Sequence, residues 1–188
     1  GRWAAGLAGV PGIFHTVHGF GFNDQTLSPW QVNLLIRLEK TAAWLSDLML
    51  MQSVANINQA LELSIAPAHK MVKVNSGILL DPFIIGRDVQ AIKHEIGINN
   101  TWPVGGWGGR FTPAHAPDVF LQACRGVLEQ FPEVNVVMVG DGEMYSQCTE
   151  LLRPGDPIIL LGYREDVPGL LATFDLFVST VRWAGLGR

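Results

Sequence analysis

Charged residues are scarce in this chain. Lys, Arg, Asp and Glu make up 16% of the 188 residues and leave a formal net charge of −4 at pH 7. They form no block of like charge, which argues against nucleic acid as the main partner. Long apolar runs are lacking too, although 48% of the residues are hydrophobic and the mean hydropathy is +0.23. No uninterrupted run reaches about 18 apolar residues, so a membrane span is not expected.

Cysteine is nearly absent. Cys124 and Cys148 fall in separate predicted helices and have no metal-ligand spacing. A disulfide framework is therefore not expected, and a reduced, cytoplasmic setting is the better interpretation. The chain starts at Gly1 without a methionine or a recognisable leader, and we interpret this start as a fragment edge.

Short apolar runs alternate with longer helical patterns along the chain. The predicted strands are 12–17, 48–52, 71–75, 103–108, 135–139, 158–161 and 176–179. Several of them are continuously apolar, as in parallel strands that are covered on both faces. The predicted helices are 29–44, 53–63, 117–131, 145–152 and 167–173, after a first helix that ends near Gly9.

This alternation predicts an α/β fold of Rossmann-like, doubly wound parallel sheets. The segment 82–101 breaks the rhythm with charged residues and the polar turn Asn99–Asn100. We place an interdomain connection at 85–101, between half-domains at 1–84 and 102–188 with about three and four strands.

The most informative stretch runs from Gly108 to Asp118, between an apolar strand and an amphipathic helix. In open α/β sheets, ligands bind outside the carboxyl ends of the strands, beside helix N-termini that favour anions. Gly108 and Gly109 would let the backbone approach a phosphate, and Arg110 could neutralise it. An ordinary packing turn is the alternative for this stretch taken alone.

Further segments before and after this stretch carry similar strand-end turns. They are Gly1–Gly19 with Thr16-Val17-His18-Gly19, Val74–Ile78, Val137–Gly142, Leu161–Pro168 and Asp175–Ser179. Together with the Gly108 stretch, this set resembles the family-four (group 1) retaining glycosyltransferases of the GT-B fold. The resemblance covers nearly the whole chain. It implies two Rossmann-like domains facing across a cleft, with residues 1–84 as the second half of the acceptor domain and 102–188 as the first half of the nucleotide-sugar donor domain.

The resemblance assigns roles residue by residue. His18 matches the family's cleft histidine, near the transferred sugar, whereas a histidine satisfied by a backbone carbonyl is the alternative. His15, on the other strand face, is expected to be structural. Arg110 matches the phosphate-binding arginine, but His115 stands where the family usually has lysine. An imidazole of ordinary pKa, about 6.5, is mostly neutral at pH 7, so the pyrophosphate should be held less strongly.

The last strand carries a second departure. Ala184 replaces the glutamate that usually precedes the glycine, and an alanine cannot contact a sugar hydroxyl. The turn with Gly185 and Gly187 could still offer backbone amides to a phosphate. Gly140, Tyr163 and Arg164 complete the predicted donor-binding set, the last two beside the nucleotide base, where a plain strand-end turn is equally consistent. The sequence has no Asp-x-Asp motif and no cluster of histidines, so a metal site is not expected. No cofactor is expected either, because the nucleotide diphosphate sugar is the donor substrate.

We therefore expect a glycosyltransferase-like protein whose parent activity transfers a sugar from a nucleotide diphosphate sugar with retention. Ala184, His115 and the truncated ends indicate that this chain is impaired. The alternatives are a non-catalytic nucleotide-sugar-binding fragment or pseudoenzyme, and a GT-B protein resembling nucleotide-sugar epimerases. The expected partners are the donor, a sugar or lipid acceptor and a second copy of the chain, with a cytoplasmic location that leaves peripheral membrane association open.

Overall fold

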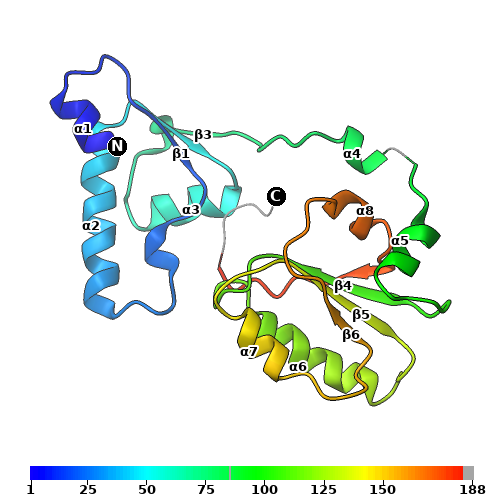
Figure 1. Cartoon of the computed structure of the whole chain (residues 1–188). Coiled ribbons are helices and arrows are strands. Elements are labelled where there is room, and N and C mark those ends of the chain that lie inside the picture. The colour runs from blue at the N-terminus through cyan, green and yellow to red at the C-terminus, as the bar shows by residue number, and fades with distance from the viewer. Residues whose placement is uncertain (85, 184–188) are drawn as a thin grey trace. The chain divides into compact units, whose positions relative to one another are not determined.

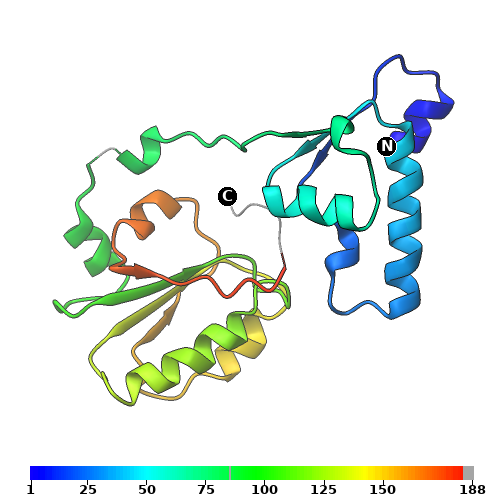
Figure 2. The same ribbon diagram turned by 180° about the vertical axis from the view of Figure 1, so that it is seen from behind.

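The computed structural model describes residues 1–84 and 86–183, in which Gly1–Ile78, with Trp183, and Leu79–Arg182 form two compact units (Figures 1 and 2). Each unit is built on its own parallel sheet. The predicted α/β fold class, with sheets of three and four strands, is confirmed.

The first unit holds the sheet β1-β2-β3 in that spatial order. Its elements are α1 (Arg2–Leu7), β1 (Phe14–Val17), η1 (Gly21–Asn23), α2 (Pro29–Leu45), β2 (Leu48–Met51), α3 (Val54–Glu62), η2 (Ala68–Lys70) and β3 (Met71–Lys73). In the register, Val17 lies beside Met51 and Met51 beside Lys73. The carboxyl ends of the three strands therefore lie at one edge of the sheet.

Local sequence signals set the helix starts in this unit. Pro29 is the first residue of α2, and Gln31 Oε1 accepts a hydrogen bond from the Ser28 amide at 2.8 Å, which is half of a capping box. Ser53 caps α3 by accepting from the Asn56 amide at 3.1 Å. These caps fix where the chain enters the two helices that follow β1 and β2.

The core of the first unit lies on one face of its sheet. Met49 and Met51 are fully buried there against Ala43 of α2 and Ala60 of α3. Both helices cover the same face, as right-handed crossovers between consecutive neighbouring strands require. The opposite face carries Phe14 and Val72, which are 67% and 45% exposed.

The second unit holds the sheet β6-β5-β4-β7. Its elements are α4 (Asp81–Ile84), α5 (Val89–Glu95), β4 (Val104–Gly108), α6 (Pro117–Leu128), β5 (Asn135–Val139), α7 (Tyr145–Glu150), β6 (Ile158–Leu160), α8 (Val167–Leu171) and β7 (Leu176–Phe177). Helices α6 and α7 lie on one face of this sheet, and α5 and α8 lie on the other (Figures 1 and 2).

The central strand β5 shows why this layering is stable. All five of its residues are buried, because alternate side chains enter two different cores. Val136 and Met138 pack with Trp107 and α6, whereas Val137 and Val139 pack with Val104 and Leu170 of α8.

The predicted strands and helices agree with the observed ones to within a few residues at each end. Two short helices of the second unit were not predicted: α4, and α5, which lies in the segment 85–101 that was interpreted as a connection. Ile92, Ile96 and Ile98 of this segment pack into the core with Leu170. The half-domain boundaries themselves stay predictions.

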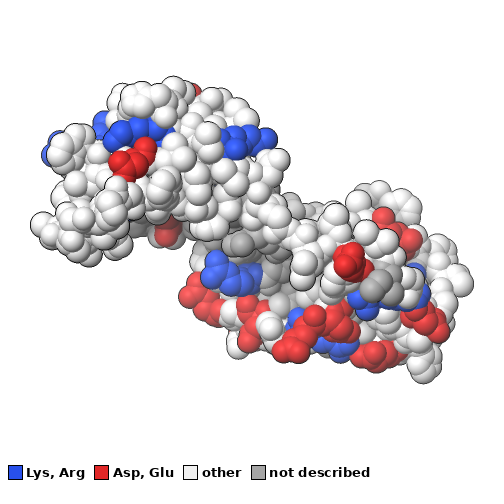
Figure 3. Space-filling view, turned by 90° about the horizontal axis from the view of Figure 1, so that it is seen from above, with Lys and Arg blue, Asp and Glu red and all other residues white. Residues whose placement is uncertain are grey.

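Acidic and basic side chains are interspersed over the second unit on the face drawn in Figure 3. Blue and red residues alternate there instead of separating into fields of one sign. No helix in the described part of the chain is long and apolar enough to cross a bilayer.

Candidate functional site

The strand order of the second unit creates a switch point. The chain runs β4, β5, β6 in one direction across the sheet and then returns to place β7 on the other side of β4. In open parallel sheets, the crevice outside the carboxyl ends of the strands at such a point is the usual ligand site. The loops that follow β4 and β7 are therefore the first candidates.

Gly108 ends β4, the loop after it begins with Gly109 and Arg110, and the end of β5 and its loop hold this loop in place. The Gly109 amide donates to Val139 O at 3.0 Å, and the Phe111 amide donates to Asp141 O at 2.9 Å. Between these two anchors, the Arg110 side chain is exposed. The structure thus presents a fixed backbone with a solvent-facing cation at the carboxyl edge.

Gly140 allows the two loops to touch. Its φ is +133°, and a Cβ there would lie 1.9 Å from Gly109 O. The Gly140 amide also donates to Gly162 O at 2.8 Å, which joins the loop after β6 to the same edge. Only glycine fits this close approach, so the predicted site residue Gly140 has a definite structural role.

His115 lies half-buried beside the same loop. Its Nδ1 is 3.0 Å from Thr112 Oγ1, and its Cδ2 lies 3.3 Å from the position that a Cβ on Gly109 would take. Burial lowers the pKa of His115, and the positive charge of Arg110 lowers it further. The imidazole is therefore neutral at pH 7, so His115 offers the site a hydrogen-bonding group and not a cation.

The loop after β6 carries Tyr163 and Arg164. Tyr163 is 72% exposed. Arg164 is held by two carboxylates, donating to Asp166 at 2.7 and 2.8 Å and to Glu95 at 2.8 Å. Hydrogen bonds to Asp166 and then to Glu95 raise the pKa of Arg164 above its ordinary value. In this structure its guanidinium ties the loop to α5, and its predicted contact with a base stays a prediction.

The loop after β7 closes the site through Thr180, which sequence reasoning missed. Its hydroxyl accepts from the indole N–H of Trp107 at 3.0 Å and lies 2.9 Å from two carbonyl oxygens of the loop after β4. No sequence signal marks Thr180, because its partners are 64 to 73 residues away. The predicted residues Gly185 and Gly187, like Ala184, lie outside the described residues.

His18, the candidate catalytic residue, directly follows β1 at the carboxyl edge of the first sheet and is exposed. Gln52 follows β2 at the same edge and is 7% exposed, and its buried Oε1 has no partner among the described residues. Val17 and Met51 are register partners and end the adjacent strands β1 and β2. His18 and Gln52, the residues that directly follow them, therefore leave the sheet at neighbouring positions. Both side chains carry hydrogen-bonding groups of the kind that suit a sugar hydroxyl.

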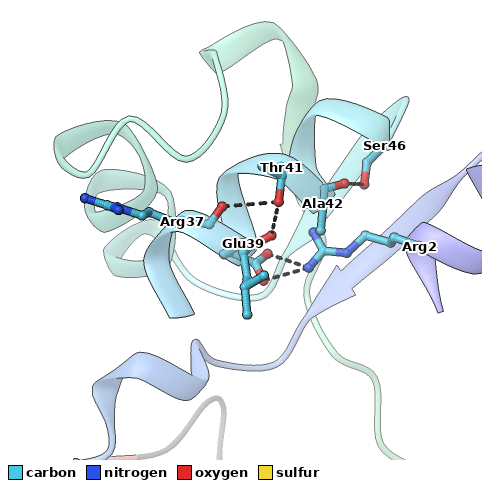
Figure 4. Close-up of polar contacts among 7 residues, drawn as sticks. Arg2, Arg37, Glu39, Thr41, Ala42 and Ser46 are labelled. Carbon is cyan, nitrogen blue, oxygen red and sulfur yellow. Dashed lines mark hydrogen bonds and ion pairs between the residues drawn. The ribbon is translucent and has the colours of Figure 1, made fainter. Parts of the chain in front are cut away.

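His15 lies elsewhere in the first unit. It lines a cavity of about 400 Å³ with Arg2, Phe22 and Glu39. Arg2 Nη2 donates to both carboxylate oxygens of Glu39, at 2.6 and 2.7 Å, and so ties α1 to α2 (Figure 4). Burial, followed by the charge of Arg2, lowers the pKa of His15. His15 therefore belongs to the packing of α1 on α2, in line with the structural role expected for it.

The two cysteines are packing residues. Cys124 and Cys148 are free and buried, and burial raises the pKa of each thiol to about 11. Within residues 1–84 and 86–183, no group of three or more His, Cys, Asp or Glu side chains is placed to hold a metal ion.

The chain has relatives among sugar-transferring enzymes. A family described as "Glycosyl transferases group 1" matches residues 103–188. The UDP-Gal:alpha-D-GlcNAc-diphosphoundecaprenol alpha-1,3-galactosyltransferase of Escherichia coli is 31% identical over 198 residues, covering 99% of this chain and 50% of the relative. The chain thus spans about half the length of that curated relative.

Solved structures give the fold. Anabaena HepE in complex with UDP has a TM-score of 0.77 at 20% identity, and the match covers 100% of this chain and 51% of HepE. The pneumococcal O-GlcNAc transferase GtfA in complex with UDP and GlcNAc has a TM-score of 0.67 at 15% identity, over 94% of this chain and 34% of GtfA. These likenesses show the GT-B fold.

Proposed function

Because the chain belongs to the group 1 glycosyltransferases, we propose that it binds the nucleotide diphosphate of a sugar donor at the carboxyl edge of β4 and β7. The observation that carries the proposal is the switch point itself. There, a backbone with close-approach glycines, an exposed Arg110 and the half-buried His115 lie together beside α6.

The chemistry of these groups suits a pyrophosphate. The Arg110 guanidinium can form charge-assisted, bidentate hydrogen bonds to phosphate oxygens. Gly108 and Gly109 let a phosphate approach the backbone, and Tyr163 and Arg164 lie on the loop that would face the base. In sugar transfer these groups would stabilise the leaving diphosphate, which is electrostatic catalysis that requires no metal.

The parent reaction we propose is transfer of a sugar from a uridine diphosphate donor to a lipid-linked sugar diphosphate, with retention of configuration. The E. coli relative is named for UDP-Gal and a diphosphoundecaprenol acceptor, and HepE was solved with UDP and UDP-glucose. His18 would hydrogen-bond the transferred sugar. A lipid-linked acceptor would place the reaction at a membrane surface.

A donor-binding pseudoenzyme is the second candidate. His115 is neutral at pH 7 where the family usually has a cation, and Ala184 lacks the carboxylate that usually stands there. Both departures weaken catalysis more than they weaken nucleotide binding, because backbone and Arg110 contacts remain. Transfer of radiolabelled galactose or glucose from its UDP derivative to a lipid-linked acceptor, above a heat-killed control, would decide for the enzyme.

We also propose that the chain associates as a homodimer through exposed apolar side chains of the first unit. Parallel sheets are normally covered on both faces, whereas Phe14 and Val72 are exposed on one face of the first sheet. Trp30 and Trp44 of α2 are 67% and 78% exposed. Light scattering coupled to size exclusion tests this, and a stable monomer at tens of micromolar would exclude the dimer.

The binding proposal is tested by calorimetry with UDP, GDP and ADP. Arg110→Ala should weaken the preferred nucleotide about 10- to 100-fold, because a hydrogen bond to a charged group contributes about 1.5–3 kcal/mol. Arg153→Ala is the matched control, since Arg153 is an exposed arginine between α7 and β6, at the amino edge of the same sheet. Equal affinity of the two variants would show that the nucleotide does not bind at Arg110.

A further inference from the structure

Thr180 is the meeting point of the two loops at the switch point. Its Oγ1 accepts a hydrogen bond from Trp107 Nε1 at 3.0 Å and donates its proton between His115 O and Ala116 O, each 2.9 Å away. Two residues later, the Arg182 amide donates to Ala114 O at 2.8 Å. The chain after β7 therefore binds three successive carbonyls of the loop after β4.

The donor to Thr180 is itself rigidly placed. Trp107 is 1% exposed, and its ring packs edge-on against Phe111 at 4.9 Å and near Phe120 at 6.4 Å. A buried indole N–H needs an acceptor, and Thr180 Oγ1 supplies it. The indole thereby fixes the hydroxyl, and the hydroxyl in turn points at the loop.

The loop that receives these bonds is held in an unusual conformation. Ala116 caps α6 with φ 49° and ψ 56°, in the left-handed region that residues other than glycine rarely adopt. Such conformations persist where surrounding contacts enforce them, and they cluster at functional sites. At Ala116 itself, the carbonyl accepts from the Thr180 hydroxyl at 2.9 Å and the amide donates to Thr112 O at 3.1 Å, while the Arg182 amide holds the neighbouring Ala114 carbonyl.

His115 connects this fixed backbone to the candidate nucleotide site. The carbonyl of His115 is bonded to Thr180, and its ring is bonded to Thr112 on the same short loop. Fixing the backbone at residues 115 and 116 therefore fixes where the imidazole stands relative to Gly109 and Arg110.

We propose that Thr180 is a positioning residue for nucleotide diphosphate binding. Through Trp107 on one side and the carbonyls of His115 and Ala116 on the other, it locks the loop after β4 in the conformation that presents His115 and Arg110 to the pyrophosphate. The identity of the ligand in this inference rests on the proposed function. The role of Thr180 in fixing the loop does not depend on it.

Three variants separate positioning from simple support of the fold. Thr180→Val keeps the shape and removes the hydroxyl, whereas Thr180→Ser keeps the hydroxyl. Thr173→Val is the control, because Thr173 is a buried threonine of the same unit whose hydroxyl donates to the nearby Leu170 O. Each variant is measured by calorimetry with UDP and by NMR titration of the His115 ring, which needs no ligand.

Thr180→Val should weaken UDP binding about tenfold or more, since a small misplacement of a binding group is costly. In the same variant the pKa of His115 should rise back toward 6.5, because the released loop exposes the ring to water and moves it away from Arg110. Thr180→Ser and Thr173→Val should leave both quantities at the wild-type values.

Thr180→Val leaves the buried indole N–H of Trp107 without an acceptor, and this variant could fail to fold for that reason. In that case UDP affinity and the His115 titration are compared between Trp107→Phe and the double variant Trp107→Phe with Thr180→Val. Removing both partners leaves no buried donor unpaired. Unchanged His115 titration and unchanged UDP affinity on loss of the hydroxyl would overturn the proposal. Failure of the wild-type chain to bind any nucleotide would instead refute the proposed function, and the His115 titration would still decide the positioning role.

Discussion

Replacing Gly140 by alanine should disrupt the candidate site more than any other single added methyl group at its edge. The new Cβ would start 1.9 Å from Gly109 O, whereas real Cβ atoms essentially never come closer than 3.0 Å to a neighbouring atom. Gly109 O is a backbone atom, so one of the two loops has to move. That movement opens the bond from the Gly109 amide to Val139 O or the one from the Gly140 amide to Gly162 O.

The cost has two parts. The φ of +133° strains any L-residue by about 1–3 kcal/mol. Overpacking adds about 1–3 kcal/mol. Together they predict a loss of about 2–6 kcal/mol in the free energy of unfolding, with UDP affinity lowered at least about tenfold because the Gly109 backbone is displaced.

Two other glycines serve as controls, one with backbone strain but no crowding and one with neither. Gly155 has φ +91° and open space within 4 Å of the position that a Cβ would take, so Gly155→Ala tests the strain alone. Gly126 lies within α6 with open space around it, so Gly126→Ala should stabilise the chain by up to about 1 kcal/mol. Urea unfolding followed by circular dichroism, together with UDP calorimetry, measures all three. If Gly140→Ala were as stable as Gly155→Ala and bound UDP like the wild type, the close approach of the two loops would not matter for the site.

The site also makes predictions on pH, chelators and thiol reagents. UDP binding should strengthen as pH falls from 8 toward 6, because the pKa of free His115 is lowered and an anionic ligand raises it; His115→Lys should bind more tightly at pH 7 and lose this part of the pH dependence, as calorimetry at several pH values would reveal. EDTA should leave UDP affinity unchanged, since Arg110 and backbone amides supply the proposed contacts; affinity that vanishes with the chelator would contradict a metal-free site. The two cysteine thiols, with pKa values of about 11, should resist a thiol reagent at pH 8 in the folded chain and react fully in urea.

The strands were predictable because burial on both faces leaves a continuous apolar run. In β5, Asn135–Val139, each of the two cores takes alternate side chains, so periodicity was unnecessary to recognise the strand. The position of the switch-point loop was predictable for a related reason, since Gly108 and Gly109 directly follow such a run and precede the Pro117 that starts α6.

Long-range polar contacts were not predictable from the chain. The sequence predicts that Arg164 is available to a ligand. In the structure, Glu95, which is 69 residues away, accepts a hydrogen bond from its guanidinium. Thr180 is one threonine among several until the fold places it beside Trp107. Helix α5 was missed although Ile92 and Ile96 are four residues apart, which is the spacing of one helix face, and their packing with Leu170 shows that this segment belongs to the core.

Binding of a nucleotide diphosphate at the carboxyl edge of β4 and β7 can be mapped residue by residue. The measurement is a UDP titration in which the amide chemical shifts of the whole chain are followed by NMR. We expect saturable shifts concentrated at Gly108–Arg110, Gly140 and Gly162–Arg164, and their loss in Arg110→Ala but not in Arg153→Ala. Shifts that cluster at the amino edge of the sheet, or none at millimolar UDP, would contradict binding at this edge.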